Sequence, residues 1–108
     1  MTDEPGCACV DDPQGRLDEI RELGMDRLFA EVSLWRCRAC GRHWLRYYYV
    51  QEAFSRSGRW YLGVISEDQA ARMTAETAKD DFASMPSYHY GGSYFDGTTG
   101  RTTGPIVI

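Results

Sequence analysis

Alternating apolar and polar positions predict three consecutive strands in the first two thirds of the chain. The three predicted strands span residues 28–37, 43–54 and 59–65. In the first of them, Ala30, Val32 and Leu34 share one face, as a period of two requires. A short Ser- and Gly-bearing turn at residues 55–58 separates the second strand from the third. The pattern therefore predicts a three-stranded antiparallel meander.

Helical spacing is expected in three short segments, at residues 16–24, 67–73 and 74–85. In the first, Leu17, Ile20 and Leu23 recur every three residues, which is typical of one face of a helix. Ser66 precedes two acidic residues and predicts the cap of the second helix. Pro86 ends the third.

The two ends of the chain differ from the middle in composition and predict less regular structure. Residues 1–15 are rich in Pro, Gly and Asp and predict a loop that carries two cysteines. Residues 87–108 are dense in Gly, Tyr and Thr and predict an irregular aromatic tail, whose last residues, 104–108, add an edge strand. We therefore expect one α+β domain over residues 1–108.

Composition narrows the class of protein. The chain has 108 residues, of which 43% are hydrophobic and 13% aromatic, and this is typical of a globular fold. No apolar run approaches the roughly 18 residues that a membrane span needs. The first ten residues carry Asp3 and Glu4 and no basic segment, which does not fit a secretory signal peptide. We expect a cytoplasmic protein without membrane association.

Charge is unevenly distributed along the chain. Residues 1–31 hold nine acids and three bases, whereas residues 34–63 hold six arginines and one acid. Residues 67–81 are acidic again, with five acids and two bases. A normally solvated surface explains this pattern equally well as two opposed faces, one for a cationic partner and one for an anionic partner.

Four cysteines form two close pairs, Cys7-Ala-Cys9 and Cys37-Arg-Ala-Cys40. Two cysteines around a tight turn can direct both sulfurs at one ion, and Gly41 supplies the flexible backbone that such a turn needs. The spacing therefore predicts one structural Zn²⁺ on Cys7, Cys9, Cys37 and Cys40.

Other chemistry for the cysteines stays open at this point. Disulfides suit secreted chains, and a bridge within Cys7-Ala-Cys9 is strained. A redox pair, an iron centre, and His43 in place of one cysteine are further alternatives. Catalytic zinc is disfavoured because four sulfurs leave no position for water.

The segment Cys37-Arg-Ala-Cys40-Gly-Arg-His-Trp44 resembles the knuckle of zinc-ribbon proteins, in which C-x-x-C-G lies at the turn between two strands. The resemblance covers about ten residues and the meander after them. It implies a zinc-ribbon-like fold and, since many ribbons bind nucleic acid, a nucleic-acid role. The chain departs from the ribbon pattern at its first pair, which is C-x-C.

Nothing in the sequence matches a catalytic motif: there is no phosphate-binding loop, no H-E-x-x-H and no G-x-S-x-G. We therefore expect a non-enzymatic protein. Its acidic flanks and aromatic sheet resemble, in general character, the small acidic immunity proteins that neutralise toxins in bacterial competition. This resemblance implies a protein partner, a toxin or effector.

Two sets of contact residues follow from these hypotheses. The protein-binding hypothesis assigns acids and tyrosines: Asp18, Glu19, Glu22, Tyr47, Tyr49, Glu67 and Asp68. The nucleic-acid alternative assigns the arginines that interleave with aromatic residues: Arg36, Arg38, Arg42, Arg46 and Arg59.

Overall fold

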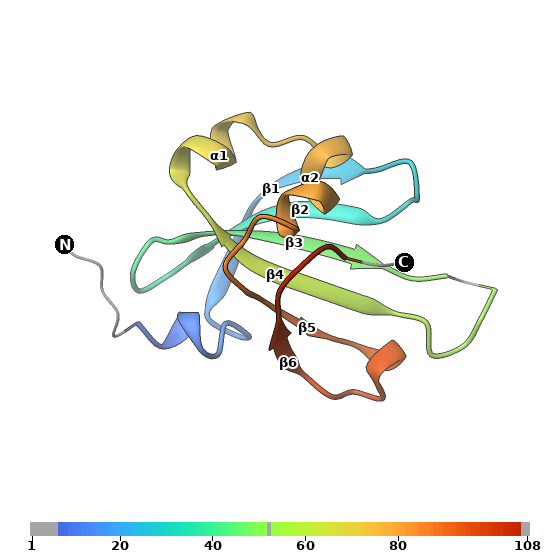
Figure 1. Ribbon diagram of the computed structural model, residues 1–108. Helices are drawn as coiled ribbons and strands as arrows, with labels where there is room; N and C mark the ends of the chain where they lie inside the picture. The colour runs from blue at the N-terminus through green and yellow to red at the C-terminus, as the bar shows by residue number, and fades with distance from the viewer. Residues whose placement is uncertain (1–6, 52, 107–108) are drawn as a thin grey trace.

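Six strands form one antiparallel sheet whose spatial order repeats the chain order. The computed structural model describes residues 7–51 and 53–106. The strands are β1 (Leu17–Met25), β2 (Glu31–Cys37), β3 (His43–Tyr49), β4 (Arg59–Ile65), β5 (Tyr88–Gly91) and β6 (Gly100–Thr102). Helices α1 (Glu67–Arg72) and α2 (Ala75–Phe82) connect β4 to β5 and lie on one face of the sheet (Figure 1). The α+β class is confirmed, and the expected three-stranded meander is the centre of a larger sheet.

Period-two alternation places the main core between the sheet and the helices. On this side, which we call the helix face, Val32 pairs with Tyr47, and Tyr47 pairs in turn with Tyr61. The ring of Phe82 from α2 packs edge-on against both tyrosines. The central strands were predicted because their apolar residues follow this alternation without interruption.

The predicted helix at residues 16–24 was wrong: residues 17–24 lie in the edge strand β1. Its pairing with β2 shifts register twice, between Glu19 and Arg21 and between Glu22 and Gly24. Each shift inserts an extra residue into β1, as in a β-bulge. The two insertions convert a two-residue alternation into the three-residue spacing that imitates a helix.

The expected helices after β4 are confirmed with shorter bounds. Ser66 caps α1 in a reciprocal capping box: its hydroxyl accepts from the Gln69 backbone N–H, and the Gln69 side chain accepts from the Ser66 backbone N–H. The turn after α2 presses on the sheet at Gly63, where an added Cβ would lie 2.1 Å from the sulfur of Met85.

The C-terminal segment is more regular than the predicted irregular tail. It contains β5, β6 and a 3₁₀ turn at Ser93–Phe95. Tyr88 is buried, and its hydroxyl donates a 2.6 Å hydrogen bond to the carbonyl of Gly104. Residues 104–106 are not in a strand, and the rest of the predicted edge strand, residues 107–108, lies outside the described residues.

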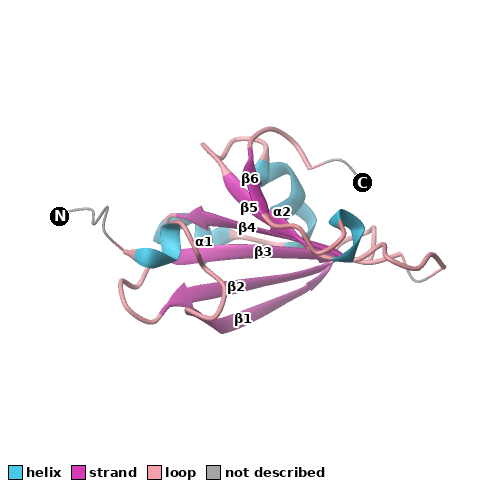
Figure 2. Ribbon diagram, turned by 90° about the horizontal axis from the view of Figure 1, so that it is seen from below, coloured by secondary structure: helices cyan, strands magenta, loops and turns pink. Residues whose placement is uncertain are grey.

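The opposite side of the sheet, which we call the open face, is not covered by α1 or α2. A smaller cluster lies here, formed by Cys9, Cys37, Trp44 and Leu62. The N-terminal segment, residues 7–16, covers it from the side opposite the helices (Figures 1 and 2). Neither helix is long and apolar enough to cross a membrane.

Candidate metal centre

The four cysteines come together at one end of the sheet. Cys37 is the last residue of β2, and Cys40 lies in the turn that leads to β3. Cys7 and Cys9 belong to a 3₁₀ turn at Ala8–Val10 and its preceding residue. The four sulfur atoms all lie within 4.8 Å of one another, which is compact enough to surround one metal ion.

The sulfur spacing fits a tetrahedral site. Cys7 Sγ lies 3.8 Å from Cys37 Sγ, and Cys9 Sγ lies 3.6 Å from Cys40 Sγ. Metal–sulfur bonds of about 2.3 Å in a tetrahedron place neighbouring sulfurs roughly 3.8 Å apart. All four cysteines are free thiols, and the two distances are far longer than the ~2.05 Å of a disulfide. The donor set and its spacing therefore suit one thiophilic ion.

The β2–β3 turn directs hydrogen-bond donors at the sulfurs. The backbone N–H of Ala39 points at Cys37 Sγ, 3.4 Å away, and the Arg42 guanidinium donates to Cys40 Sγ at 3.2 Å. Gly41 closes the turn by donating its N–H to the Cys37 carbonyl, with a φ of 80° that favours glycine. Such donors stabilise thiolates, the form that binds metal.

Burial and hydrogen bonding shift the pKa values of the cysteine thiols in different directions. Burial raises the pKa of Cys40, but hydrogen bonds that include the backbone and side chain of Arg42 outweigh it and lower the pKa to about 6. The pKa of Cys37 is also lowered, because backbone hydrogen bonds outweigh burial. Burial raises the pKa of Cys9, and hydrogen bonds from its neighbouring cysteines add to that effect. The β2–β3 turn thus favours the thiolate form of Cys37 and Cys40, whereas burial favours the protonated thiol at Cys9.

The N-terminal cysteines are held in place by residues that the sequence did not single out. His89 of β5 has its Nε2 2.8 Å from the Val10 carbonyl oxygen, and Arg101 of β6 pairs with Asp11 at 2.9 Å. The His89 ring also packs on Trp44, with 5.9 Å between centroids. No local spacing reveals these contacts, since they join residues some 45 to 90 positions apart.

Arg38, which the nucleic-acid hypothesis assigned as a contact residue, joins the β2–β3 turn to the start of β1. Its backbone N–H donates to the Arg16 carbonyl at 3.2 Å, and its guanidinium pairs with Asp18 at 2.7 Å. Asp18, assigned to a protein partner, is therefore also engaged within the chain. Both side chains remain about half exposed.

The other assigned arginines do not form one continuous face. Arg59 is buried on the helix face, where its guanidinium stacks on the rings of Tyr49 and Tyr94 at 5.0 and 3.9 Å. Arg46 lies on the open face, since its cross-strand partner Leu62 is in the open-face cluster. Arg36 and Arg42 lie at the end of the sheet that carries the cysteines, on either side of the β2–β3 turn. The single arginine surface expected for nucleic acid is not formed.

Among the assigned tyrosines, Tyr47 does not reach the surface. Its side chain is 0% exposed, and its hydroxyl donates a 2.5 Å hydrogen bond to Asp26. The assignment of Tyr47 as an exposed contact was wrong because its strand face points into the main core. Tyr49 is half-buried and packs at the edge of that core.

The assigned acids lie on two sides of the sheet. Glu19 and Glu22 pair with Trp35 and Ser33 of β2, and all four lie on the open face. Glu67 and Asp68 begin α1 on the helix face. The acids therefore do not merge into one patch.

The cluster can hold a metal through four sulfurs, and in the described part of the chain no other group of three or more histidine, cysteine or acidic side chains does so. His43, considered as a substitute ligand, begins β3 and is not part of the cluster. No known protein-family model, curated protein or solved structure matches this chain.

Proposed function

We propose that this chain is a non-enzymatic protein-binding module whose fold is stabilised by one structural Zn²⁺ on Cys7, Cys9, Cys37 and Cys40. The four sulfurs, with two spacings close to a tetrahedral edge, support zinc. Four protein ligands fill the shell and leave no position for a reacting water, so the ion serves the fold.

The observation that carries the binding role is a cluster of exposed apolar side chains at the end of the sheet away from the cysteines. We call it the apolar tip; it consists of Met25, Leu28, Phe29, Val50 and Phe54. Met25 ends β1, Leu28 and Phe29 lie in the β1–β2 connection, and the last two residues lie in the β3–β4 loop. Since β2 and β3 are neighbours, both connections lie at the same end (Figure 1). A cluster of this kind marks an interaction surface.

The backbone of the β1–β2 connection, which carries Phe29, is held by internal hydrogen bonds. Buried Asp26 accepts hydrogen bonds from the backbone N–H groups of Leu28 and Ala30 at 2.9 and 3.0 Å. Between them Phe29 has a φ of 66° and is 77% exposed. A left-handed bulky residue costs roughly 1–3 kcal/mol and persists where the surroundings impose it. The loop thus presents an aromatic ring that needs little ordering on binding.

The chemistry of the tip favours a protein pocket over a lipid surface. The chain carries a net charge of −4, whereas anionic bilayers attract basic segments. Arg27 is exposed beside Phe29 and makes no ion pair within the described chain. The partner that fits best offers an apolar pocket with an acidic rim, since aromatic and arginine side chains dominate interface energies.

Photo-crosslinking from the tip tests this role. Phe29→p-benzoylphenylalanine in the zinc-loaded chain should crosslink one protein in host lysate, and the same change at Glu76, exposed on α2, should not. Phe29→Asp should abolish recovery of that protein in a pull-down at high salt. Equal crosslinking from both positions, or co-sedimentation with lipid vesicles in place of a protein partner, would contradict the proposal.

An immunity role is a narrower form of the same proposal. It is supported by the chain's acidity and its aromatic contact residues. It requires that the captured partner be toxic when expressed alone and harmless when this chain is co-expressed. A harmless partner leaves the binding role in place and removes the immunity role.

A further inference from the structure

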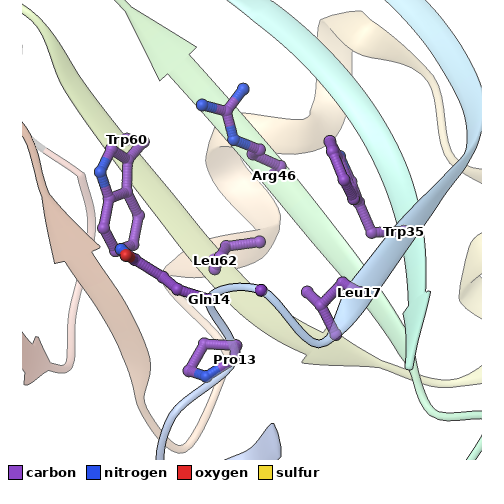
Figure 3. A pocket seen from close by; sticks show the side chains of 8 residues that line it. Pro13, Gln14, Leu17, Trp35, Arg46, Trp60 and Leu62 are labelled. Carbon is purple, nitrogen blue, oxygen red and sulfur yellow. The ribbon is translucent and has the colours of Figure 1, made fainter. Parts of the chain in front are cut away.

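A cleft on the open face lies outside both the metal centre and the apolar tip. Its volume is about 290 Å³, and Figure 3 shows the side chains around it. Pro13, Gln14 and Gly15 of the N-terminal segment form one wall. The rest of the lining comes from the sheet: Leu17, Trp35, Arg46, Trp60 and Leu62.

Both indole rings of the cleft are fixed by their own neighbours. Trp35 donates its Nε1–H to the Ser33 hydroxyl at 2.7 Å. Trp60 lies on its cross-strand partner Gly91, where an added Cβ would come within 2.5 Å of the ring. Each indole is half-buried, so one part of the ring is held and another faces the cleft. Rigid aromatic walls of this kind bind planar groups with little loss of entropy.

Arg46 is the one charged residue in the lining, and its guanidinium extends between the two tryptophans (Figure 3). The side chain is half-buried and rests over the Tyr48 ring at 5.1 Å. Within the described residues the guanidinium has no hydrogen-bond acceptor and no ion pair. A partly desolvated guanidinium with unused donors favours a planar anion, which it can bind through two parallel hydrogen bonds.

We propose that this cleft binds a small aromatic carboxylate, with the ring against Trp35 or Trp60 and the carboxylate on Arg46. The volume is near the lower limit for ligand pockets, roughly 300 Å³, and suits one ring system with one charged group. Glu19 and Glu31 lie close enough to interact electrostatically with Arg46, and they disfavour a doubly charged group. A monoanion is therefore preferred over a phosphate ester.

Titration of the zinc-loaded chain with benzoate and indole-3-carboxylate tests the site. Calorimetry gives the affinity, and the indole Nε1–H signals of Trp35 and Trp60 in NMR spectra give the location. We expect saturable binding of both acids, with shifts of these two signals. Benzamide and phenyl phosphate should bind at least about tenfold more weakly than benzoate. Benzamide is neutral and cannot pair with Arg46, whereas phenyl phosphate carries two negative charges close to Glu19 and Glu31.

Two variants separate the role of Arg46 from a general effect. Arg46→Gln should weaken benzoate binding at least about tenfold. The matched control Arg21→Gln, an exposed arginine on β1, should leave it unchanged. Equal affinity for benzoate and benzamide, unchanged binding by Arg46→Gln, or no saturable binding below about 10 mM would overturn the proposal. The comparison of acid with amide uses the unmodified chain, so it decides the question even if the variant fails to fold.

Discussion

The hydroxyl of Tyr47 lies 2.5 Å from a carboxylate oxygen of Asp26, and both side chains are buried. The same carboxylate fixes the backbone of the β1–β2 connection through Leu28 and Ala30. One hydrogen bond thus links the main core to the apolar tip. The exposed ring of Phe29 depends on a polar group inside the fold.

Tyr47→Phe should lower the free energy of unfolding by about 1–3 kcal/mol, because it leaves a buried carboxylate short of one donor. Urea denaturation measures the loss. Tyr48→Phe on the open face is the matched control and should change stability little. If the two variants were equally stable, the Asp26–Tyr47 bond would have no special role.

Cys37→Ser should remove the metal and unfold or strongly destabilise the chain, since the ion joins the N-terminal segment to the β2–β3 turn. Elemental analysis should give one zinc per unmodified chain, and a strong chelator should lower the thermal stability of the unmodified chain, leaving a weakened but still folded metal-free protein. Ala39→Ser, in the same turn, should retain both metal and fold. A variant at Cys37 with unchanged thermal stability would refute a structural metal.

Metal-free protein should lose stability as the pH falls from about 9 to about 6. The folded chain lowers the pKa of Cys40 from 9.0 to about 6, so its contribution is complete above the unfolded pKa and is lost as the pH drops through the folded one. The alkylation rate of Cys40, followed by mass spectrometry, should therefore have its midpoint near pH 6. Arg42→Gln should move the midpoint upward. A midpoint that stays near 9 in the unmodified chain would contradict this account.

His89→Phe should weaken zinc binding by about fivefold, because it keeps a ring against Trp44 and loses the bond to Val10, worth about 1 kcal/mol. Competition with a chromogenic chelator measures the affinity. His43→Phe is the control, since His43 is outside the cluster. The idea that β5 positions the N-terminal cysteines fails if both variants bind zinc like the unmodified chain.

The sequence predicts those parts of the fold in which periodicity is uninterrupted. The strands around Leu34, Leu45 and Leu62 follow from alternation, and α1 follows from the cap at Ser66. The cysteine cluster follows from spacing alone. The edge strand β1 was missed because two bulges hide its period.

The remaining features depend on contacts between distant residues. The apolar tip depends on a buried Asp26 and an exposed Phe29, whereas aspartate is usually exposed and phenylalanine usually buried. The cleft arises because β2 and β4, the two neighbours of β3, each place a tryptophan on the open face of the sheet. Neither arrangement has a local signature in the chain.

The sheet order, which repeats the chain order, has a consequence for synthesis on the ribosome. Each strand pairs with the strand that precedes it in the chain, so the sheet can extend one strand at a time. The N-terminal segment is the exception: its ties to His89 and Arg101 form only after most of the chain has been made. Until then, the N-terminal segment contacts the sheet through the four-cysteine cluster and through the hydrogen bond from the Arg38 N–H to the Arg16 carbonyl, both of which use the earlier β2–β3 turn.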